Sequence, residues 1–213
     1  MTVTQLPTTP VLHEGIDPAI LYFGTPVVLV STTNSDGTSN LAPVSSVFWL
    51  GRTAVLGFGL ASHTVANLRR ERECVLNLPS ASLVGAVDRL ALTTGAPVVN
   101  QAKAGRGYVH VKDKFAHAGL APRPSETVAP PGVMECPVVL ESTLLAIHTT
   151  DFHLVQVEVG RTFIHPGLRL EGHDNRIDPE RWRPLIMSFQ RFFGLGDEVH
   201  PSRLASIDEE MYR

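Results

Sequence analysis

The sequence predicts a mainly β fold, an antiparallel β-barrel with a few helical additions. The chain of 213 residues is 43% hydrophobic, which suffices for a sizeable core and does not fit a disordered chain. It contains about seven strand-like runs that are short and rich in β-branched or apolar residues. These runs follow one another in hairpin-like succession and do not alternate regularly with helices, which argues against a doubly wound parallel sheet.

The first three predicted strands lie early in the chain. The β-branched, apolar run at 27–33 predicts a buried strand. Residues 34–37, Asn-Ser-Asp-Gly, predict a hairpin turn because Asp-Gly supplies the positive φ angles that such turns need. The return strand runs into residues 40–48, where Pro43 cannot donate to a ladder, so the strand is bulged or lies at an edge there. Residues 53–58 form the third predicted strand.

The later strands are separated by a long irregular stretch. A fourth strand is predicted at 74–78, and Cys74 within it is interpreted as a core residue and not as a nucleophile. Further strands are predicted at 138–148, 152–159 and 161–165. Residues 93–135 are rich in Gly, Pro and Lys. Such a stretch inside a domain is usually functional or mobile, and the alternative is a surface excursion.

Four segments carry helical signals. Asp17-Pro18 predicts a short helical turn through Ile20 and Leu21. Residues 64–72 predict a helix with Ser62 as its N-cap, and residues 82–92 have helical spacing. Asp178-Pro179 predicts the start of a last helix that ends at Gly194 and begins at or kinks near Pro184. Its predicted apolar stripe consists of Trp182, Leu185, Ile186, Phe189 and Phe193.

Composition and charge exclude several classes of protein. The formal net charge is -3 and no basic block stands out, so nucleic acid is not expected as a partner. No apolar run is long enough to span a bilayer, and the N-terminus lacks the charged and apolar regions of a signal peptide. We therefore expect a cytoplasmic protein. The two cysteines suggest neither a disulfide scaffold nor a zinc site.

The most informative stretch is residues 40–67, which read as strand, turn, strand, loop and helix. Hydroxyls, an amide and small residues stand where a ligand could approach the backbone. The free N–H groups and the dipole at a helix N-terminus favour an anion, and Ser62, His63 and Thr64 would add side-chain donors. A phosphate is the expected ligand. The alternative is that Ser62 only caps the helix and that Ser45 and Ser46 only satisfy a bulge.

The usual catalytic motifs are missing. Gly57-x-Gly59-x-x-Ser62 imitates a dinucleotide fingerprint, but the third Gly is absent and repeated strand–helix units do not follow. There is no G-x-S-x-G or H-E-x-x-H motif, the nine His residues are scattered, and no paired carboxylates are evident. A chain that could hold a phosphate without its own nucleophile or acid–base pair indicates that a cofactor supplies the chemistry.

The sequence resembles the flavin reductase-like, FMN-binding split-barrel family. The resemblance covers residues 18–195, leaving an N-terminal arm at 1–17 and a C-terminal tail at 196–213. Its specificity comes from the order of several linked motifs. These are F-G-T-P-V-V-L-V-S-T at 23–32, D-G-T-S-N-L-A-P-V-S-S at 36–46, S-H-T-V-A-N-L at 62–68, E-C-V-L-N-L-P-S at 73–80, D-K-F-A-H-A-G-L at 113–120, E-C-P-V-V-L-E at 135–141 and D-P-E-R-W-R-P-L-I-M at 178–187.

The resemblance implies a six-stranded antiparallel split barrel that works as a homodimer, with FMN near the subunit interface. It assigns no catalytic side chain and no metal. His63 departs from the basic residue that family members often carry, so the phosphate would meet a side chain that can be neutral at pH 7. The resemblance places Asn40, Ala42, Pro43, Ser45 and Ser46 along the isoalloxazine and ribityl, and Ser62, His63, Thr64 and Asn67 around the ribityl phosphate.

The implied reaction is hydride transfer from NADH or NADPH to flavin, after which reduced flavin serves a partner monooxygenase or another acceptor. Phe115 and the 93–131 loop are expected to form the wall of the nicotinamide site, and the alternative for Phe115 is a packing anchor. Arg106, Lys112 and Lys114 are candidates for an NADPH phosphate, although a solvated basic loop is the preferred interpretation. Two other functions stay open: an FMN-binding electron carrier without nicotinamide activity, and a flavin-dependent oxidase or oxygenase acting on a small molecule.

Overall fold

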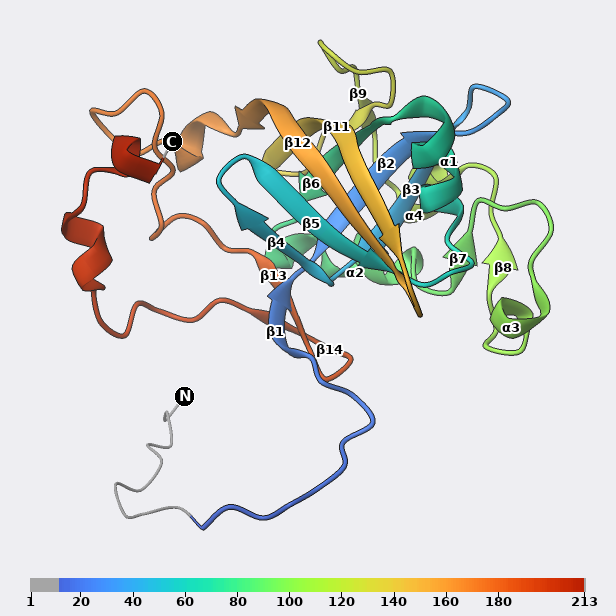
Figure 1. Cartoon of the computed structure of the whole chain (residues 1–213). Coiled ribbons are helices and arrows are strands. Elements are labelled where there is room, and N and C mark those ends of the chain that lie inside the picture. The colour runs from blue at the N-terminus through green and yellow to red at the C-terminus, as the bar shows by residue number, and fades with distance from the viewer. Residues whose placement is uncertain (1–11, 213) are drawn as a thin grey trace.

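The computed structural model describes residues 12–212 and is built around one antiparallel sheet of seven strands (Figure 1). Each neighbouring pair in this sheet is antiparallel, so the predicted fold class is confirmed. The resemblance implied six strands, and the sheet has one more. In spatial order the strands are β3 (Ser39–Val44), β2 (Val28–Thr33), β6 (Glu73–Leu78), β11 (Val138–Thr149), β12 (His153–Ile164), β5 (Thr53–Phe58) and β4 (Val47–Leu50).

The connection between β3 and β4 makes the sheet curl into a barrel. These two strands stand at opposite ends of the strand order, yet only Ser45 and Ser46 join them along the chain. Two edges joined by so short a link must lie together, and β3 contacts β5 directly. The backbone N–H of Gly57 in β5 donates to the carbonyl oxygen of Ser46 at 2.8 Å. We call residues 43–46 the closing corner.

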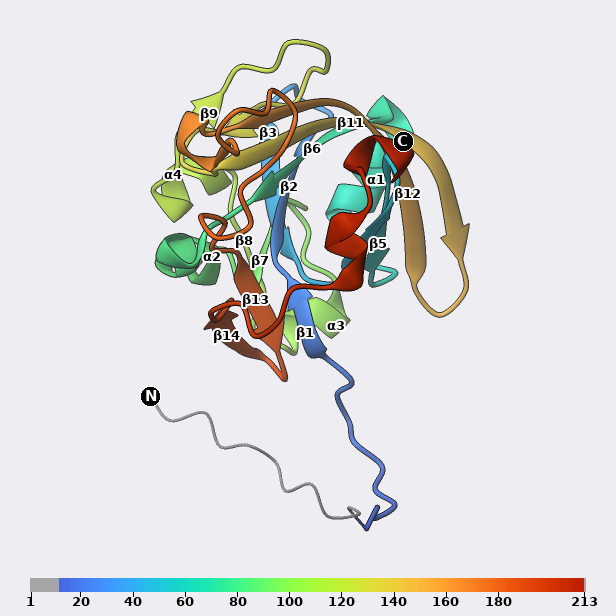
Figure 2. The ribbon, with the colours of Figure 1, turned by 90° about the vertical axis from the view of Figure 1, so that its left-hand side faces the viewer.

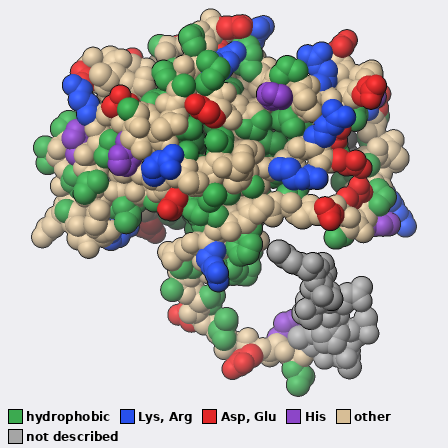
Figure 3. All heavy atoms as spheres, turned by 180° about the vertical axis from the view of Figure 1, so that it is seen from behind, with side chains coloured by type: hydrophobic (Ala, Val, Ile, Leu, Met, Phe, Trp, Pro, Cys, Tyr) green, Lys and Arg blue, Asp and Glu red, His purple; other side chains and the backbone are tan. Residues whose placement is uncertain are grey.

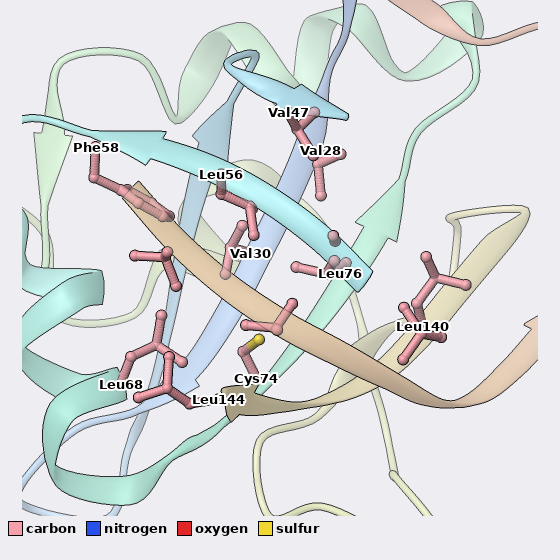
Figure 4. Packing of buried hydrophobic residues seen from close by; sticks show 14 of the residues in the cluster. Val28, Val30, Val47, Leu56, Phe58, Leu68, Cys74, Leu76, Leu140 and Leu144 are labelled. Carbon is pink, nitrogen blue, oxygen red and sulfur yellow. The ribbon is translucent and has the colours of Figure 1, made fainter. Parts of the chain in front are cut away.

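The barrel interior is filled by side chains from one face of each strand (Figure 4). Val28, Leu56 and Leu76 lie there, and Leu68 reaches the same core from the helix that follows β5. Cys74 is fully buried among them, which confirms its interpretation as a core residue.

A second core covers the outside of β2, β3 and β6. Leu29 and Leu41 pack there against Val87 of α2 (Val84–Arg89) and Phe115 of α4 (Lys114–Ala118). Strand β2 is therefore buried on both faces, which explains why residues 27–33 form a continuous apolar run instead of alternating with polar residues.

The predicted helix after β5 is present as α1 (His63–Glu71). The Oγ of Ser62 caps it by accepting from the N–H of Val65 at 3.3 Å. The predicted segment at 82–92 contains a 3₁₀ turn η1 (Ala81–Leu83) followed by α2. The predicted turn at Asp17 is wrong. Residues 12–22 contain no helix, and residues 12–19 are exposed and extend away from the barrel in both ribbon views, so no apolar partner there holds a helical turn (Figure 1, Figure 2).

The predicted helix at 178–194 is also wrong. Residues 185–194 form a hairpin of β13 (Leu185–Ser188) and β14 (Arg191–Gly194), which pairs with β1 (Phe23–Pro26) in a three-stranded sheet. Phe189 and Gln190 have φ angles of 45° and 62°, so they make the tight turn of a two-residue hairpin. Pro184 lacks a backbone donor and its ring would clash with the carbonyl four residues earlier, so it disfavours a helix running from Asp178 through Leu185. Strand β12 runs through the strand predicted separately at 161–165.

The irregular stretch 93–135 divides into two parts. The first contains β7 (Thr93–Thr94), α3 (Gln101–Ala104) and β8 (Val109–His110), and the second contains β9 (Pro122–Arg123) and β10 (Gly132–Val133). Both ribbon views place β7, β8 and α3 near one end of the barrel and β9 at the other (Figure 1, Figure 2). The buried carboxylate of Glu141 fastens the second part by accepting from the N–H groups of Glu126 and Thr127.

The C-terminal region is irregular. It contains the 3₁₀ turns η2 (Pro166–Leu168), η3 (Arg203–Ser206) and η4 (Glu209–Tyr212). Within residues 12–212 no helix is both long and apolar enough to cross a membrane. Acidic and basic side chains are interspersed on the face shown in Figure 3, without a continuous basic area.

Candidate functional site

A cavity of about 840 Å³ opens beside the closing corner of the barrel. Its walls come from the closing corner, the start of α1, residues 90–95 and the β13–β14 hairpin. These segments are far apart in the sequence. The cavity exists because the short β3–β4 connection brings the sheet edges together next to the N-terminus of α1.

The start of α1 is the polar end of this cavity. Ser62, His63 and Thr64 all line it, and the first N–H groups of a helix have no acceptor within the helix. His63 Nε2 lies 2.8 Å from Asn34 Oδ1, which fixes the ring against the β2–β3 turn with its proton on Nε2. Burial lowers the pKa of His63, and the nearby positive charges of Lys114 and Lys103 lower it further. His63 therefore contributes a neutral hydrogen-bonding group.

Lys114 is the most buried positive charge of the site. Its side chain lines the cavity although the residue is only 2% exposed, and its Nζ donates to the carbonyl oxygen of Thr93 at 3.4 Å. Burial, followed by the charge of Lys103, lowers the pKa of Lys114 to about 8. Lys103 and Arg106 line the same cavity. The preferred interpretation of a solvated basic loop is therefore wrong for Lys114, because α4 carries it into the interior.

Asn40 offers an unused acceptor. The residue is 2% exposed, and its Nδ2 donates to the hydroxyls of Thr32 and Thr64, both at 3.3 Å. Its Oδ1 is buried and has no hydrogen-bond partner among the described residues. A buried acceptor without a donor is unfavourable by about 1–3 kcal/mol, so a ligand hydroxyl that donates to it would relieve a cost already present.

Gly95 is the point of closest approach in the wall. A Cβ added to Gly95 would lie 2.5 Å from Asn40 Oδ1 and 2.8 Å from a ring carbon of His63. Only glycine fits here without moving both side chains. The 92–95 segment is therefore packed tightly against the residues expected to contact the ligand.

Most of the predicted site residues come together in this cavity, and two do not. Asn67 is buried behind the wall, where its Nδ2 donates to Thr32 Oγ1 and Asn34 Oδ1. Phe115 packs in the second core and does not line the cavity. Its contact with a nicotinamide stays a prediction. The predicted residues that line the cavity are Asn40, Ala42, Pro43, Ser45, Ser46, Ser62, His63 and Thr64.

Some lining residues were predicted only as part of a segment, and others were missed. The 93–131 loop was expected to form a wall of the nicotinamide site, and the residues of this loop that line the cavity are Thr93, Thr94, Gly95, Lys103, Arg106, Tyr108 and Lys114. Met187 and Phe192 also line the cavity, and both lie on the β13–β14 hairpin. They were missed because this segment was predicted as a helix. The hydroxyl of Tyr22 hydrogen-bonds to Ser46 Oγ at the closing corner.

The described residues contain neither a metal-binding cluster nor a reactive thiol. Residues 12–212 contain no group of three or more His, Cys, Asp or Glu side chains that could hold a metal ion. Both cysteines are buried, and burial raises the pKa of Cys74 to about 12 and that of Cys136 further still. Neither thiol is available as a thiolate nucleophile at neutral pH.

Comparison with known proteins agrees with this geometry. The family model described as a flavin reductase like domain matches residues 20–196. The uncharacterized protein YdfE of Bacillus subtilis (strain 168) is 37% identical over 188 residues, which are 87% of this chain and 91% of that protein. An uncharacterized protein of Methanothermobacter thermautotrophicus is 27% identical over 175 residues, covering 76% of this chain and 73% of that protein.

Two solved structures share the fold. Flavoredoxin of Desulfovibrio vulgaris (Miyazaki F) superposes with a TM-score of 0.76 and 19% identity, covering 92% of this chain and all of that chain. Nitrilotriacetate monooxygenase component B from Bacillus cereus superposes with a TM-score of 0.67 and 22% identity, covering 86% of this chain and 89% of that chain. These matches confirm the resemblance and the split-barrel fold expected from the sequence.

Proposed function

Because the chain belongs to the flavin reductase-like family, we propose that it is an FMN-binding flavin reductase using NADH or NADPH. Bound flavin supplies the redox chemistry by accepting a hydride from the nicotinamide. The chain's own residues bind and orient the cofactor, and no acid–base pair is required of them.

The observation that carries the proposal is the pairing of the α1 N-terminus with Lys114. Backbone N–H groups and the helix dipole at Ser62–Thr64 favour an anion, and a nearby negative charge offsets the cost of burying an ammonium group. Lys114 lines the same cavity, and within residues 12–212 its side chain forms no ion pair with a carboxylate. The phosphate of FMN supplies that charge.

The remaining walls suit the rest of the cofactor. A volume of about 840 Å³ lies within the usual range of ligand pockets, which is about 300–1,000 Å³. Asn40 Oδ1 can accept from a ribityl hydroxyl. Met187 and Phe192 offer apolar and aromatic surface, and the closing corner offers backbone groups and the hydroxyl of Ser46. We place the ring system between these two surfaces.

We further propose that the protein is a homodimer. The outer face of β4, β5 and β12 carries Phe48, which is 53% exposed, and Leu50, which is 71% exposed, and the exposed Leu154 lies two strands away on the same face, opposite Gly57. Exposed apolar residues clustered on one sheet face are typical of interfaces. This face adjoins Gly57 and Leu60 of the cavity wall, so a second copy docked there would lie close to the flavin.

The reduced flavin would serve a partner monooxygenase or another acceptor. The neighbour from Bacillus cereus is named as a component of a monooxygenase, which supports a role of this kind without naming a substrate. A location in the cytoplasm stays a prediction.

The deciding experiment is an anaerobic absorbance spectrum of the purified protein with FMN, recorded before and after addition of NADH or NADPH. A reductase bleaches the oxidised flavin band rapidly, and the faster nucleotide identifies the donor. A flavin that stays yellow would replace this proposal with the electron-carrier or oxidase function. Titration with riboflavin is the matched control, since it lacks only the phosphate and should bind more weakly than FMN.

A further inference from the structure

The cavity carries more positive charge than one phosphate needs. Lys103, Arg106 and Lys114 all line it, and none of the Asp and Glu residues in the described part of the chain does. A phosphate monoester such as that of FMN carries a charge of about -1.5 to -2 near neutral pH. In the proposed site this phosphate is held by the start of α1 and Lys114, so Lys103 and Arg106 remain available for a second anion.

These cations follow one another away from the start of α1. Burial lowers the pKa of Lys114 and that of His63, and the positive charge of Lys103 adds to both effects. Burial also lowers the pKa of Lys103, and the charge of Arg106 adds to it. Lys103 therefore neighbours both the phosphate position and Arg106. Arg106 is the cation of the cavity that the FMN phosphate leaves without a role.

The turn that follows α3 carries Arg106 and Tyr108 to the cavity wall. Their backbone N–H groups both donate to the carbonyl oxygen of Lys103, at 3.0 and 3.1 Å. Gly107 between them has a φ angle of 84°, in the left-handed region that favours glycine. The pairing of β8 with β7, which itself lines the cavity, holds this turn against the wall.

Both cationic groups are positioned and lack a carboxylate partner. The Nζ of Lys103 lies 5.4 Å from the centroid of the Tyr108 ring, a cation–π contact that keeps the ammonium group beside the cavity. The Nε of Arg106 donates to the carbonyl oxygen of Ala102 at 3.1 Å. Within residues 12–212 neither side chain forms an ion pair. The terminal nitrogens of the Arg106 guanidinium can therefore bind an oxyanion at two points.

We propose that Arg106 and Lys103 form a second anion subsite of the cavity, which binds a phosphate group of the nicotinamide donor. The inference rests on the proposed function, because it takes NADH or NADPH as the donor. Two parts of the donor have this chemistry: the diphosphate, which both nucleotides contain, and the 2′-phosphate, which only NADPH contains. Arginine suits either part, since its planar guanidinium meets two phosphate oxygens at once.

The test measures the binding of NADP⁺ and NAD⁺ to the FMN-loaded full chain by isothermal titration calorimetry. The oxidised nucleotides bind without hydride transfer, so the measurement does not depend on turnover. Arg106→Met should weaken NADP⁺ binding about three- to tenfold, as expected for one exposed charged contact, and leave FMN affinity within about twofold. A loss confined to NADP⁺ assigns the subsite to the 2′-phosphate, and an equal loss for NAD⁺ assigns it to the diphosphate.

Two matched controls separate charge from local structure. Arg106→Lys also loses the hydrogen bond from Nε to Ala102 but keeps the positive charge, so it should retain part of the nucleotide affinity that Arg106→Met loses. Arg191 is exposed on β14 and does not line the cavity. Arg191→Met should therefore change neither nucleotide affinity nor FMN affinity.

Each other outcome has a definite meaning. Wild-type affinity for both nucleotides in Arg106→Met would overturn the inference and leave the proposed function in place. Equal losses in Arg106→Met and Arg106→Lys would assign the effect to the structure of the turn and also overturn it. A loss of FMN affinity alone would assign Arg106 to the FMN phosphate instead. If the wild-type protein binds neither nucleotide and its flavin stays oxidised with NADH and NADPH, the proposed function fails together with the inference.

Discussion

Lys114→Met should make the ligand-free protein more stable while weakening its hold on FMN. Lys114 carries a buried ammonium group whose hydrogen bond in the described structure is a long one to the carbonyl of Thr93. Methionine has a side chain of similar length, fills the same space and removes the charge. If Lys114 had only a packing role, Lys114→Met would be expected to destabilise the protein.

The size of the effect follows from the pKa of Lys114. Burial lowers that pKa from 10.5 to about 8, which corresponds to a cost of charging on the order of 3 kcal/mol in the folded state. Below pH 8 the lysine is protonated in both the folded and unfolded states, so the whole cost is present at pH 7. The variant should therefore gain up to about 3 kcal/mol of unfolding free energy at pH 7, less the loss of one hydrogen bond of about 1 kcal/mol.

The pH dependence has a definite sign. Between pH 8 and 10.5 the unfolded state binds more protons at this lysine than the folded state does, so the wild-type protein gains stability as the pH rises through this window. The Lys114→Met variant lacks this amine, so its stability does not rise in this way between pH 8 and 10.5. Its advantage over the wild type should therefore shrink between pH 7 and pH 10.

Urea unfolding of wild type and variant at pH 7 and pH 10 measures both effects, and titration with FMN and riboflavin measures the site. FMN affinity should fall about tenfold or more, as for loss of a charged hydrogen bond, while riboflavin affinity stays nearly constant. Lys112→Met is the matched control, because Lys112 is exposed and should change stability little. A Lys114→Met protein that is less stable than wild type by the same amount at both pH values would refute the argument.

Three further predictions test other parts of the site. Ser62→Ala combined with Thr64→Ala should weaken FMN binding by about 1–3 kcal/mol for each lost charged hydrogen bond, and unchanged affinity by isothermal calorimetry would remove the phosphate assignment. Gly95→Ala should reduce the affinity for both FMN and riboflavin, since its Cβ would lie 2.5 Å from Asn40 Oδ1, and wild-type affinity for both would contradict the packed wall. Phe48→Arg should convert the proposed dimer to a monomer in light scattering, whereas a wild-type protein that is already monomeric with flavin bound would rule out the interface.

Much of the barrel could be predicted because its signals are local. The β2–β3 turn was recognised from Asp36-Gly37, and Gly37 indeed has a φ of 80°. The helix α1 was recognised from its cap, which is a contact within one turn. The apolar run at 27–33 was recognised as buried, although its burial by two different cores depends on α2 and α4 from later in the chain.

The β13–β14 hairpin could not be predicted from its pattern. Apolar residues at 185, 186, 189 and 193 match a helical period, and alternation was obscured because Phe189 belongs to the turn. The decisive features are the positive φ angles at Phe189 and Gln190, which neither residue type announces in the sequence. Pairing with β1, more than 150 residues away in the chain, holds the hairpin where it lines the cavity.

The buried position of Lys114 also could not be predicted from its neighbours in the sequence. Lys114 stands in a segment with Lys112 and Asp113, which in one dimension is typical of a solvated loop. In the structure Asp113 caps α4 by accepting from the N–H of Ala116, and this short helix turns Lys114 inward while Lys112 stays exposed. The buried position is unfavourable for an ammonium group on its own. Its persistence in the folded chain is therefore best explained by a ligand that brings a negative charge to the start of α1, and this makes the lysine a better guide to the phosphate than the hydroxyls that first suggested it.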